Sequence, residues 1–192
     1  QIIKFPNQLC LEKLSEETPI YKNDSLINSI LQNPEVKSIH PFATRYAILK
    51  TADDIEGVLV KGLDDSYDFD NLKQFVKQGR AIRFNDTAFS REILVSDYTA
   101  SRMKLHVNDT IIIYFIMPGE NPRPRKITIT GIYKTGIEEY DRLFAIGDIK
   151  LIQQLNNWQS DEVGGYELFF HDYRQIDTTA IDLYNMDAFP ET

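Results

Sequence analysis

Two neighbouring segments with different hydrophobic patterns constrain the fold more than any other part of this chain. Thr110–Met117 is a nearly continuous run of β-branched, aromatic and other apolar residues, while apolar residues and threonines alternate in Arg125–Lys134. The short connection Pro118–Pro124 is rich in proline. Two strand-forming runs joined by a short turn-rich loop are typical of an antiparallel hairpin. The sequence therefore predicts a β-hairpin over residues 110–134.

The remaining hydrophobic patterns predict a mixed α+β fold. Two long strands are expected at Val36–Thr51 and Ile55–Leu63, with a turn at residues 52–54 between them. Shorter strands are expected at residues 1–5, 92–95, 143–146 and 166–170, and residues 7–21 are expected to form a loop. Helices are predicted over residues 25–32, with Asp24 as the cap, and over 71–77, closed by Gly79. Two more are predicted from Ser96 or Asp97 to Lys104 and over residues 149–155, and a last one from Asp172 or Asp177 to about Tyr184.

Composition and charge exclude several classes of protein. The 192 residues include 29 acidic and 21 basic side chains, which gives a formal charge of −8. Nucleic-acid binders need a basic face, so this balance argues against them. The longest apolar run, Ile111–Met117, is far shorter than the ~20 residues of a membrane helix. A single cysteine, Cys10, excludes an internal disulfide and a multi-cysteine zinc site.

No pattern of catalytic or metal-binding residues is found, so the sequence predicts neither an enzyme nor a cofactor or metal site. The acidic stretch from Asp64 to Asp70 has Phe69 where a calcium loop needs glycine, and is better interpreted as a solvated linker. His40, His106 and His171 lack the spacing of zinc ligands, and Cys10 has no histidine near it in the sequence. The 10 tyrosines and 11 phenylalanines leave a carbohydrate-binding module open as an alternative, although cross-strand packing explains most of them.

The tip of the predicted hairpin is the candidate binding site. Three prolines and two arginines occur within eight residues: Pro118, Gly119, Glu120, Asn121, Pro122, Arg123, Pro124 and Arg125. Proline reduces the entropy lost on docking, and arginine can hold a carboxylate with two hydrogen bonds. The tip fits contact with a protein partner equally as well as it fits a rigid turn with solvated charges.

Several short motifs in a fixed order resemble one family of transporters. They are Val60-Lys61-Gly62, Gly79-Arg80, Glu92–Ser96, Leu105–Asp109, Thr130–Tyr133, Gly136–Asp141, Gly147–Ile149, Leu155–Trp158 and Val163–Glu167. Together they resemble the periplasmic (MacB-like core) domain of FtsX-like ABC transporter permeases, of the lipoprotein-releasing LolC/LolE type. The resemblance extends from about Ile30 to His171.

This resemblance implies a domain organisation. Residues 1–63 and 165–192 would form a porter-like subdomain of β-α-β units, and residues 64–164 an inserted, smaller α/β subdomain of the Sabre type. The chain ends at Thr192, before a second complete porter unit fits. In the lipoprotein-releasing type one permease carries an extended hairpin, the hook, that recruits a soluble lipoprotein carrier. The matching segment here is Met117–Arg125, which is shorter than the usual hook.

The resemblance also implies a function. The chain would be a fragment of a permease in the bacterial inner membrane and would lie on the periplasmic side. The transmembrane helices of the permease would lie outside these residues. An internal fragment also agrees with Gln1 as the first residue. It would couple ATP-driven motion to the release of outer-membrane lipoproteins. The implied partners are a separate ABC ATPase subunit, a second permease copy or a paralogue, and a lipoprotein cargo or its carrier. Within the family, MacB-like efflux of a small molecule or peptide and FtsX-like activation of a peptidoglycan hydrolase are the alternatives.

Overall fold

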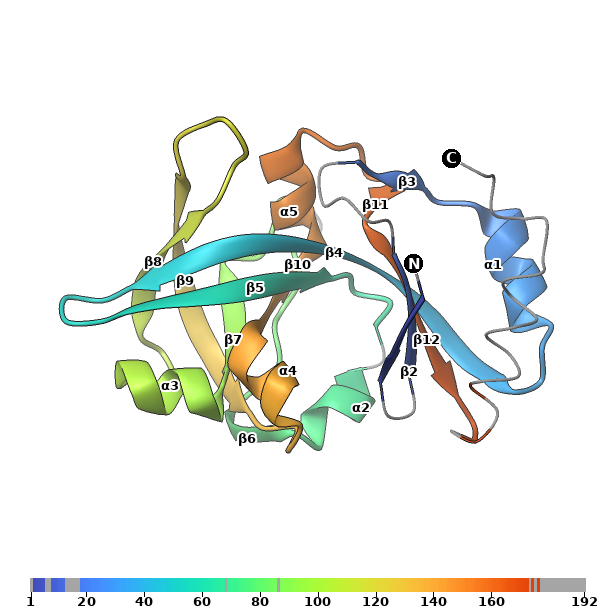
Figure 1. Ribbon diagram of the computed structural model, residues 1–192, viewed down its shortest axis with the longest axis horizontal. Helices are drawn as coiled ribbons and strands as arrows, with labels where there is room; N and C mark the ends of the chain where they lie inside the picture. Colours follow the sequence, from blue (N-terminus) through green and yellow to red (C-terminus); the bar gives the residue numbers. More distant parts are fainter. Residues whose placement is uncertain are drawn as a thin grey trace. The chain divides into compact units, whose positions relative to one another are not determined.

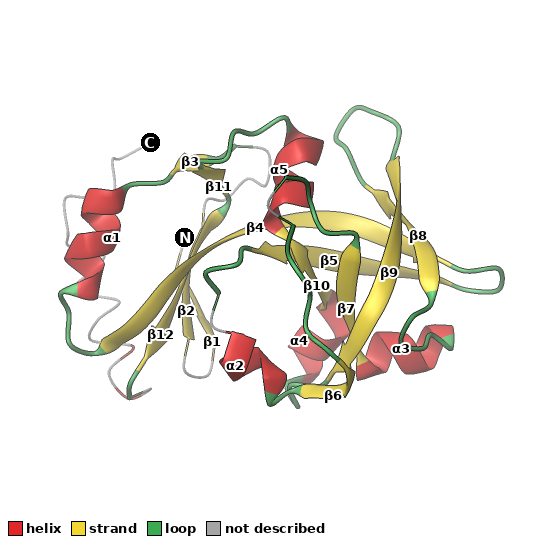
Figure 2. Ribbon diagram, turned by 180° about the vertical axis from the view of Figure 1, so that it is seen from behind, coloured by secondary structure: helices red, strands yellow, loops and turns green. Residues whose placement is uncertain are grey.

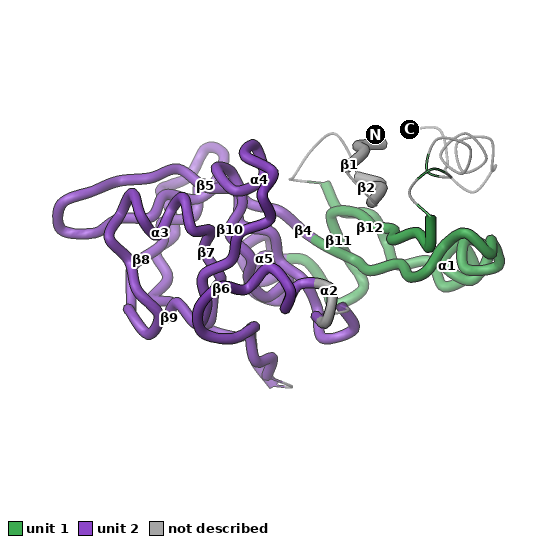
Figure 3. The backbone as a smooth tube through the Cα atoms, turned by 90° about the horizontal axis from the view of Figure 1, so that it is seen from below, with its two compact units in different colours: residues 1–42, 158–192 green, residues 43–157 purple. Residues whose placement is uncertain are grey.

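The computed structural model describes residues 2–5, 8–12, 18–67, 69–85, 87–172, 174 and 176. The chain divides into two compact units (Figure 3). Unit 1 consists of residues 1–42 and 158–192, and unit 2 consists of residues 43–157. Among the described residues, no helix has both the length and the hydropathy that crossing a membrane requires.

Unit 1 is built on an antiparallel sheet in the order β1-β2-β12-β4. The strands are β1 (Ile2–Phe5), β2 (Gln8–Glu12), β12 (Gly165–Phe170) and the first part of β4 (Val36–Lys50). A second, two-stranded sheet pairs β3 (Ile20–Tyr21) with β11 (Glu162–Val163). The prediction of a loop over residues 7–21 is therefore wrong, because β12 and β11, which are distant in the sequence, pair with the short strands β2 and β3.

The helix of unit 1 follows the predicted amphipathic pattern. Helix α1 (Asp24–Leu31) begins after Asn23, whose Oδ1 accepts a hydrogen bond from the Leu26 main-chain N–H at 3.0 Å. Asn23, and not the predicted Asp24, is thus the cap. Leu26 and Ile30, one turn apart, are buried. The predicted final helix, to about Tyr184, lies outside the described residues except for its first few positions.

Unit 2 contains a closed β-barrel (Figures 1 and 2). Around the barrel the order is β4-β5-β10-β7-β9-β8, and β8 pairs with β4 again to complete the circle. The additional strands are β5 (Ile55–Leu63), β7 (Glu92–Ser96), β8 (Thr110–Phe115), β9 (Arg123–Tyr133) and β10 (Phe144–Asp148). β6 (Val76–Gly79) pairs with the far end of β9. Because β8 pairs with β4 as well as with β9, the six strands form a closed circle of neighbours.

The barrel strands bury their apolar residues in the two-residue period of a sheet. In β8, Ile111, Ile113 and Phe115 are buried, while Thr110 and Ile112 are exposed. The predicted hairpin is confirmed, since β8 and β9 pair in antiparallel register from Thr110 opposite Thr128 to Phe115 opposite Arg123. The two predicted long strands are confirmed as β4 and β5.

Four short helices connect the strands of unit 2. They are α2 (Phe69–Lys73), α3 (Asp97–Met103), α4 (Glu138–Leu143) and α5 (Ile149–Asn156). α3 and α5 match the prediction, and the mostly polar α4 was not predicted. The prediction that a helix over 71–77 is closed by Gly79 is wrong. α2 ends at Lys73, and Gly79 ends β6 with a φ of +77°, where an added Cβ would lie 2.2 Å from the Thr130 carbonyl oxygen.

The two units divide the chain at other positions than the predicted subdomains. Residues 43–63, which the resemblance assigns to the porter-like part, belong to unit 2. The reason is the barrel: β5 pairs with β10, and the second part of β4 pairs with β8. The porter-like and Sabre-like assignments of residues 1–63 with 165–192 and of 64–164 stay a prediction.

Candidate functional site

The tip of the β8–β9 hairpin projects from the barrel as an exposed loop (Figure 1). Residues 118–122 are exposed, and Gly119 has a φ of +68°, which glycine adopts without strain. The main-chain N–H of Glu120 donates to the Met117 carbonyl at 3.2 Å and so closes a turn. This loop is open to contact along its whole length.

Arg123, one of the two arginines of the predicted site, is engaged within the fold. Its Nη1 donates to the Leu155 carbonyl at 2.8 Å, near the C-terminal end of α5, and its Nη2 lies 2.7 Å from Glu120 Oε2. A cation at this end of a helix also interacts favourably with the helix dipole. Arg125 donates to the carbonyl of its neighbour Pro124 at 2.9 Å. Arg123 therefore fastens the tip to α5, whereas Arg125 is partly exposed and bonds to the adjacent Pro124 carbonyl.

Exposed apolar side chains lie beside this hairpin. Tyr46, Ile112 and Ile116 are 50%, 45% and 43% exposed. The Ile116 main-chain N–H donates to the Tyr46 carbonyl at 2.9 Å, so these two residues are direct neighbours. Ile112 pairs with Lys50 on one side and with Lys126 on the other. The outer surface of β4, β8 and β9 thus combines apolar side chains with two lysines.

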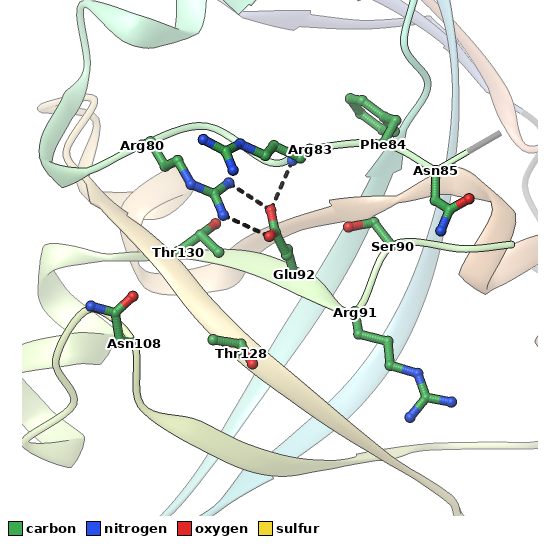
Figure 4. A pocket seen from close by; sticks show the side chains of 10 residues that line it. All are labelled: Arg80, Arg83, Phe84, Asn85, Ser90, Arg91, Glu92, Asn108, Thr128 and Thr130. Carbon is green, nitrogen blue, oxygen red and sulfur yellow. Dashed lines mark hydrogen bonds and ion pairs between the residues drawn. The ribbon is translucent and has the colours of Figure 1, made fainter.

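The sequence did not predict a second site, which is an open depression in unit 2 (Figure 4). It has a volume of about 650 Å³. The segment between β6 and β7, the turn before β8, and β9 line it with Arg80, Arg83, Phe84, Asn85, Ser90, Arg91, Glu92, Asn108, Thr128 and Thr130. Three arginines and one glutamate give this lining a positive charge, although the chain as a whole is strongly acidic.

An arginine–glutamate pair forms the centre of this depression. Arg80 Nη1 and Nη2 donate to Glu92 Oε2 and Oε1, both at 2.7 Å, and the Arg83 main-chain N–H donates to Glu92 Oε2 at 2.8 Å. The hydrogen bond from Arg80 lowers the pKa of Glu92, against the opposing effect of burial. The same bond raises the pKa of Arg80. Glu92 therefore holds the Arg80 guanidinium and the main chain of Arg83 in place.

Main-chain hydrogen bonds hold the lining segment against the barrel. Arg80 N–H donates to the Thr130 carbonyl at 2.9 Å, and Thr128 N–H donates to the Arg91 carbonyl at 2.8 Å. Ser90 N–H donates to Asp148 Oδ2 at 2.7 Å. Asp148 is buried, and burial raises the pKa of its carboxyl. The segment is thereby attached at both of its ends.

The other residues considered from the sequence do not converge on a site. Asp64 Oδ1 accepts from the Ser66 hydroxyl at 2.6 Å, as in a local turn. His40 is buried in β4 opposite Glu167, and His106 Nδ1 lies 3.6 Å from Asp109 Oδ2. The side chains of Cys10, Asp68 and Asp70 lie outside the described part. Within the part that the structure describes, no three His, Cys, Asp or Glu side chains are grouped to hold a metal ion.

Comparison with known proteins relates the fold to transporter domains. No family profile and no curated protein matches the sequence. The extracellular domain of the ABC-type transporter YknZ from Gram-positive bacteria is similar over 90% of this chain and 88% of its own, with a TM-score of 0.53 and 16% identity. The periplasmic region of MacB from Actinobacillus actinomycetemcomitans is similar over 85% of this chain and 72% of its own, with a TM-score of 0.53 and 13% identity.

The chain shares the fold of these domains. The predicted fold class, mixed α+β of the porter-like kind seen in YknZ and MacB, is confirmed. Two of the motifs that carry the family resemblance place a glycine where β5, β10 and α5 pack closely. Gly62 of β5 pairs directly with Gly147 of β10, and α5 begins two residues after Gly147.

The site at Arg80 and Glu92 could not be found from the sequence. Both residues belong to the quoted motifs, but no local pattern pairs charges that are twelve positions apart on different strands. They meet because β6 and β7 lie on either side of β9.

Proposed function

We propose that this chain is an extracytoplasmic domain of an FtsX-like ABC transporter permease, on the periplasmic side of a bacterial inner membrane. The observation that carries the proposal is the likeness to the extracellular domain of YknZ, which extends over 90% of this chain. ATP hydrolysis would take place on a separate ATPase subunit. The resulting motion would reach this domain through transmembrane helices outside these residues, and a second permease copy or a paralogue would complete the transporter.

We further propose that the domain handles outer-membrane lipoproteins and that the hairpin tip, Pro118 to Arg125, contacts the lipoprotein or its carrier. The tip is exposed and carries Arg125 as an accessible cation. The exposed Tyr46, Ile112 and Ile116 lie on the neighbouring strands. Apolar surface next to cationic side chains suits a partner with apolar and acidic groups.

A second candidate is MacB-like efflux of a small molecule or peptide. The likeness to the periplasmic region of MacB supports it, since it covers 85% of this chain with the same TM-score as the likeness to YknZ. The two candidates differ in the cargo and use the same mechanical coupling, so a direct search for the cargo distinguishes them.

The experiment is photo-crosslinking in the full-length parent protein, assembled with its ATPase. A crosslinking amino acid replaces Asn121 at the tip, and a matched control replaces Glu139, which is exposed in α4. We expect ATP-dependent crosslinks from position 121 to a lipoprotein or a periplasmic carrier. Crosslinks to a secreted peptide would favour efflux. Equal crosslinking from both positions would contradict a role of the tip, and a parent gene without apolar segments of about 20 residues would contradict the permease assignment.

A further inference from the structure

The depression around Arg80 and Glu92 has the composition of a ligand site. Its other two arginines, Arg83 and Arg91, are exposed, and the described residues place no carboxylate within ion-pair distance of either guanidinium. The Arg91 guanidinium lies 5.8 Å from the centre of the Phe89 ring. Figure 4 shows the two side chains extending in different directions from the central pair. One ligand could contact both arginines only if it were extended.

The other side chains that line the depression are polar and mostly uncharged. Asn85, Ser90, Asn108, Thr128 and Thr130 contribute amide or hydroxyl groups to the lining, and Phe84 is its single apolar side chain. Peptide ligands generally need apolar pockets for their side chains, and this lining has almost none. Amide and hydroxyl groups beside one aromatic ring match a ligand that is rich in hydroxyl groups.

Thr130 provides a separate observation. The residue is 3% exposed, and its Oγ1 has no hydrogen-bond partner among the described residues. A buried hydroxyl without a partner is unusual, because its desolvation is not compensated. Thr130 is one of the residues that line the depression.

Hydrogen bonds hold Arg80 and the main chain of the site in place without any ligand. Glu92 orients Arg80, and the Lys150 ammonium donates to the Asn85 carbonyl at 2.8 Å. The Ser90 and Arg91 main chains are held by hydrogen bonds to Asp148 and Thr128. A preformed site loses less conformational entropy on binding.

From these observations we infer that the depression binds an anionic saccharide. Arg83 and Arg91 would contact separate negative groups of the ligand. Asn108 and the NH2 group of Asn85 would bind its hydroxyl groups, while Asn85 Oδ1 accepts from the Thr87 N–H and hydroxyl at 3.0 Å and the Thr128 hydroxyl lies 3.4 Å from that of Thr110. All residues of this site belong to unit 2, and the inference does not depend on the assignment of the chain to a transporter.

The test is an NMR titration of the complete 192-residue chain with three probes. Trigalacturonate carries spaced carboxylates and hydroxyl groups, maltotriose is a neutral saccharide of similar size, and inorganic phosphate is a bare anion. We expect trigalacturonate to shift the amide resonances of Ser90, Asn108 and Thr128 in a saturable way, and to bind at least about tenfold more tightly than the other two probes. Binding should weaken as salt concentration rises.

Variants decide whether the arginines carry the binding. The double variant Arg83→Gln with Arg91→Gln should weaken trigalacturonate binding by at least about tenfold. The matched control, Arg102→Gln with Arg142→Gln, removes the same charge from arginines that pair with Glu56 and Glu138 outside the depression. It should bind as the parent does, and dispersed spectra verify that both variants fold. Equal loss in both variants, equal binding of maltotriose or phosphate, or no saturable shift would each overturn the inference.

Discussion

Gly62 allows α5 to pack directly on the barrel, and replacing it with alanine tests how the barrel is held together. A Cβ at position 62 would lie 2.6 Å from Ile149 Cα, 2.9 Å from Ile149 N and 3.0 Å from Ile152 Cδ1. Carbon atoms pack favourably at about 3.5–4.0 Å, so the start of α5 would have to move by roughly 1 Å. Two of these three contacts are with main-chain atoms, which cannot turn away as a side chain can.

The same strand supplies a matched control. An added Cβ at Gly57, in β5 as well, meets no atom within 4 Å. Both substitutions remove the same conformational freedom from the unfolded chain, so their difference isolates the clash with α5. Gly57→Ala should be neutral or stabilise by up to about 1 kcal/mol. Overpacking typically costs about 1–3 kcal/mol, and the main-chain contacts place Gly62→Ala near the upper end of that range.

Urea unfolding followed by far-UV circular dichroism measures this difference. With a slope of about 2 kcal/mol per M, a difference of about 3 kcal/mol separates the two midpoints by roughly 1.5 M. Adding Ile152→Val to Gly62→Ala removes the side-chain contact and leaves both main-chain contacts, so it should restore little stability. Equal midpoints for the two glycine variants, or full recovery by Ile152→Val, would refute the reasoning.

Three further predictions concern the charged groups of unit 2. Glu92→Gln should lower the free energy of unfolding by only about 1 kcal/mol at neutral pH, because the pair with Arg80 is partly exposed. The pKa of Glu92 in the folded chain is lowered from 4.5, so the stability difference between parent and variant should disappear as the pH falls below 4.5. Denaturation curves over this pH range measure it. Because the pKa of Asp148 is raised, the folded chain binds more protons than the unfolded chain, so the free energy of unfolding should fall as the pH rises above 3.8 until Asp148 is ionised. Asp148→Asn should remove this pH dependence and should cost about 1–3 kcal/mol, because a hydrogen-bond acceptor is lost. Arg123→Gln should speed hydrogen exchange at the end of α5 by freeing the Leu155 carbonyl, whereas Arg125→Gln should not, and equal exchange in both would contradict the anchoring role of Arg123.

Local patterns in the sequence predict the elements that carry their own signal. The alternation around Ile127 and Ile129 predicts β9, and the apolar spacing of Leu26 and Ile30 predicts α1. The missed elements, β2, β3, β6, β11 and α4, are short and depend on partners elsewhere in the chain. β2, for example, forms between β1 and β12, and β12 lies more than 150 positions away. Such a strand is stabilised by pairing and not by its own composition.

Closure of the barrel is likewise a property of distant pairs. β10 pairs in parallel with β5, and the second part of β4 pairs with β8, across separations that no local pattern encodes. The close packing of α5 on the barrel is nevertheless visible in the sequence as two glycines, since Gly62 of β5 pairs with Gly147 of β10 where α5 packs. These glycines belong to motifs that carry the family resemblance, and close packing is the physical reason for glycine at Gly62.

The candidate site predicted from the sequence and the one found in the structure lie on the same strand. β9 begins with Arg123, which anchors the hairpin tip, and it continues through Thr128 and Thr130, which line the depression. β9 pairs with β8 from Arg123 to Thr128 and with β7 from Thr128 to Tyr133, so the two pairings meet at Thr128. Between the tip and the depression β9 is therefore held by β8, in one continuous antiparallel register. The tip is connected to the barrel through the β8 register and, by the Arg123 hydrogen bond to the Leu155 carbonyl, through the end of α5, so these two connections link it to the depression on the same strand.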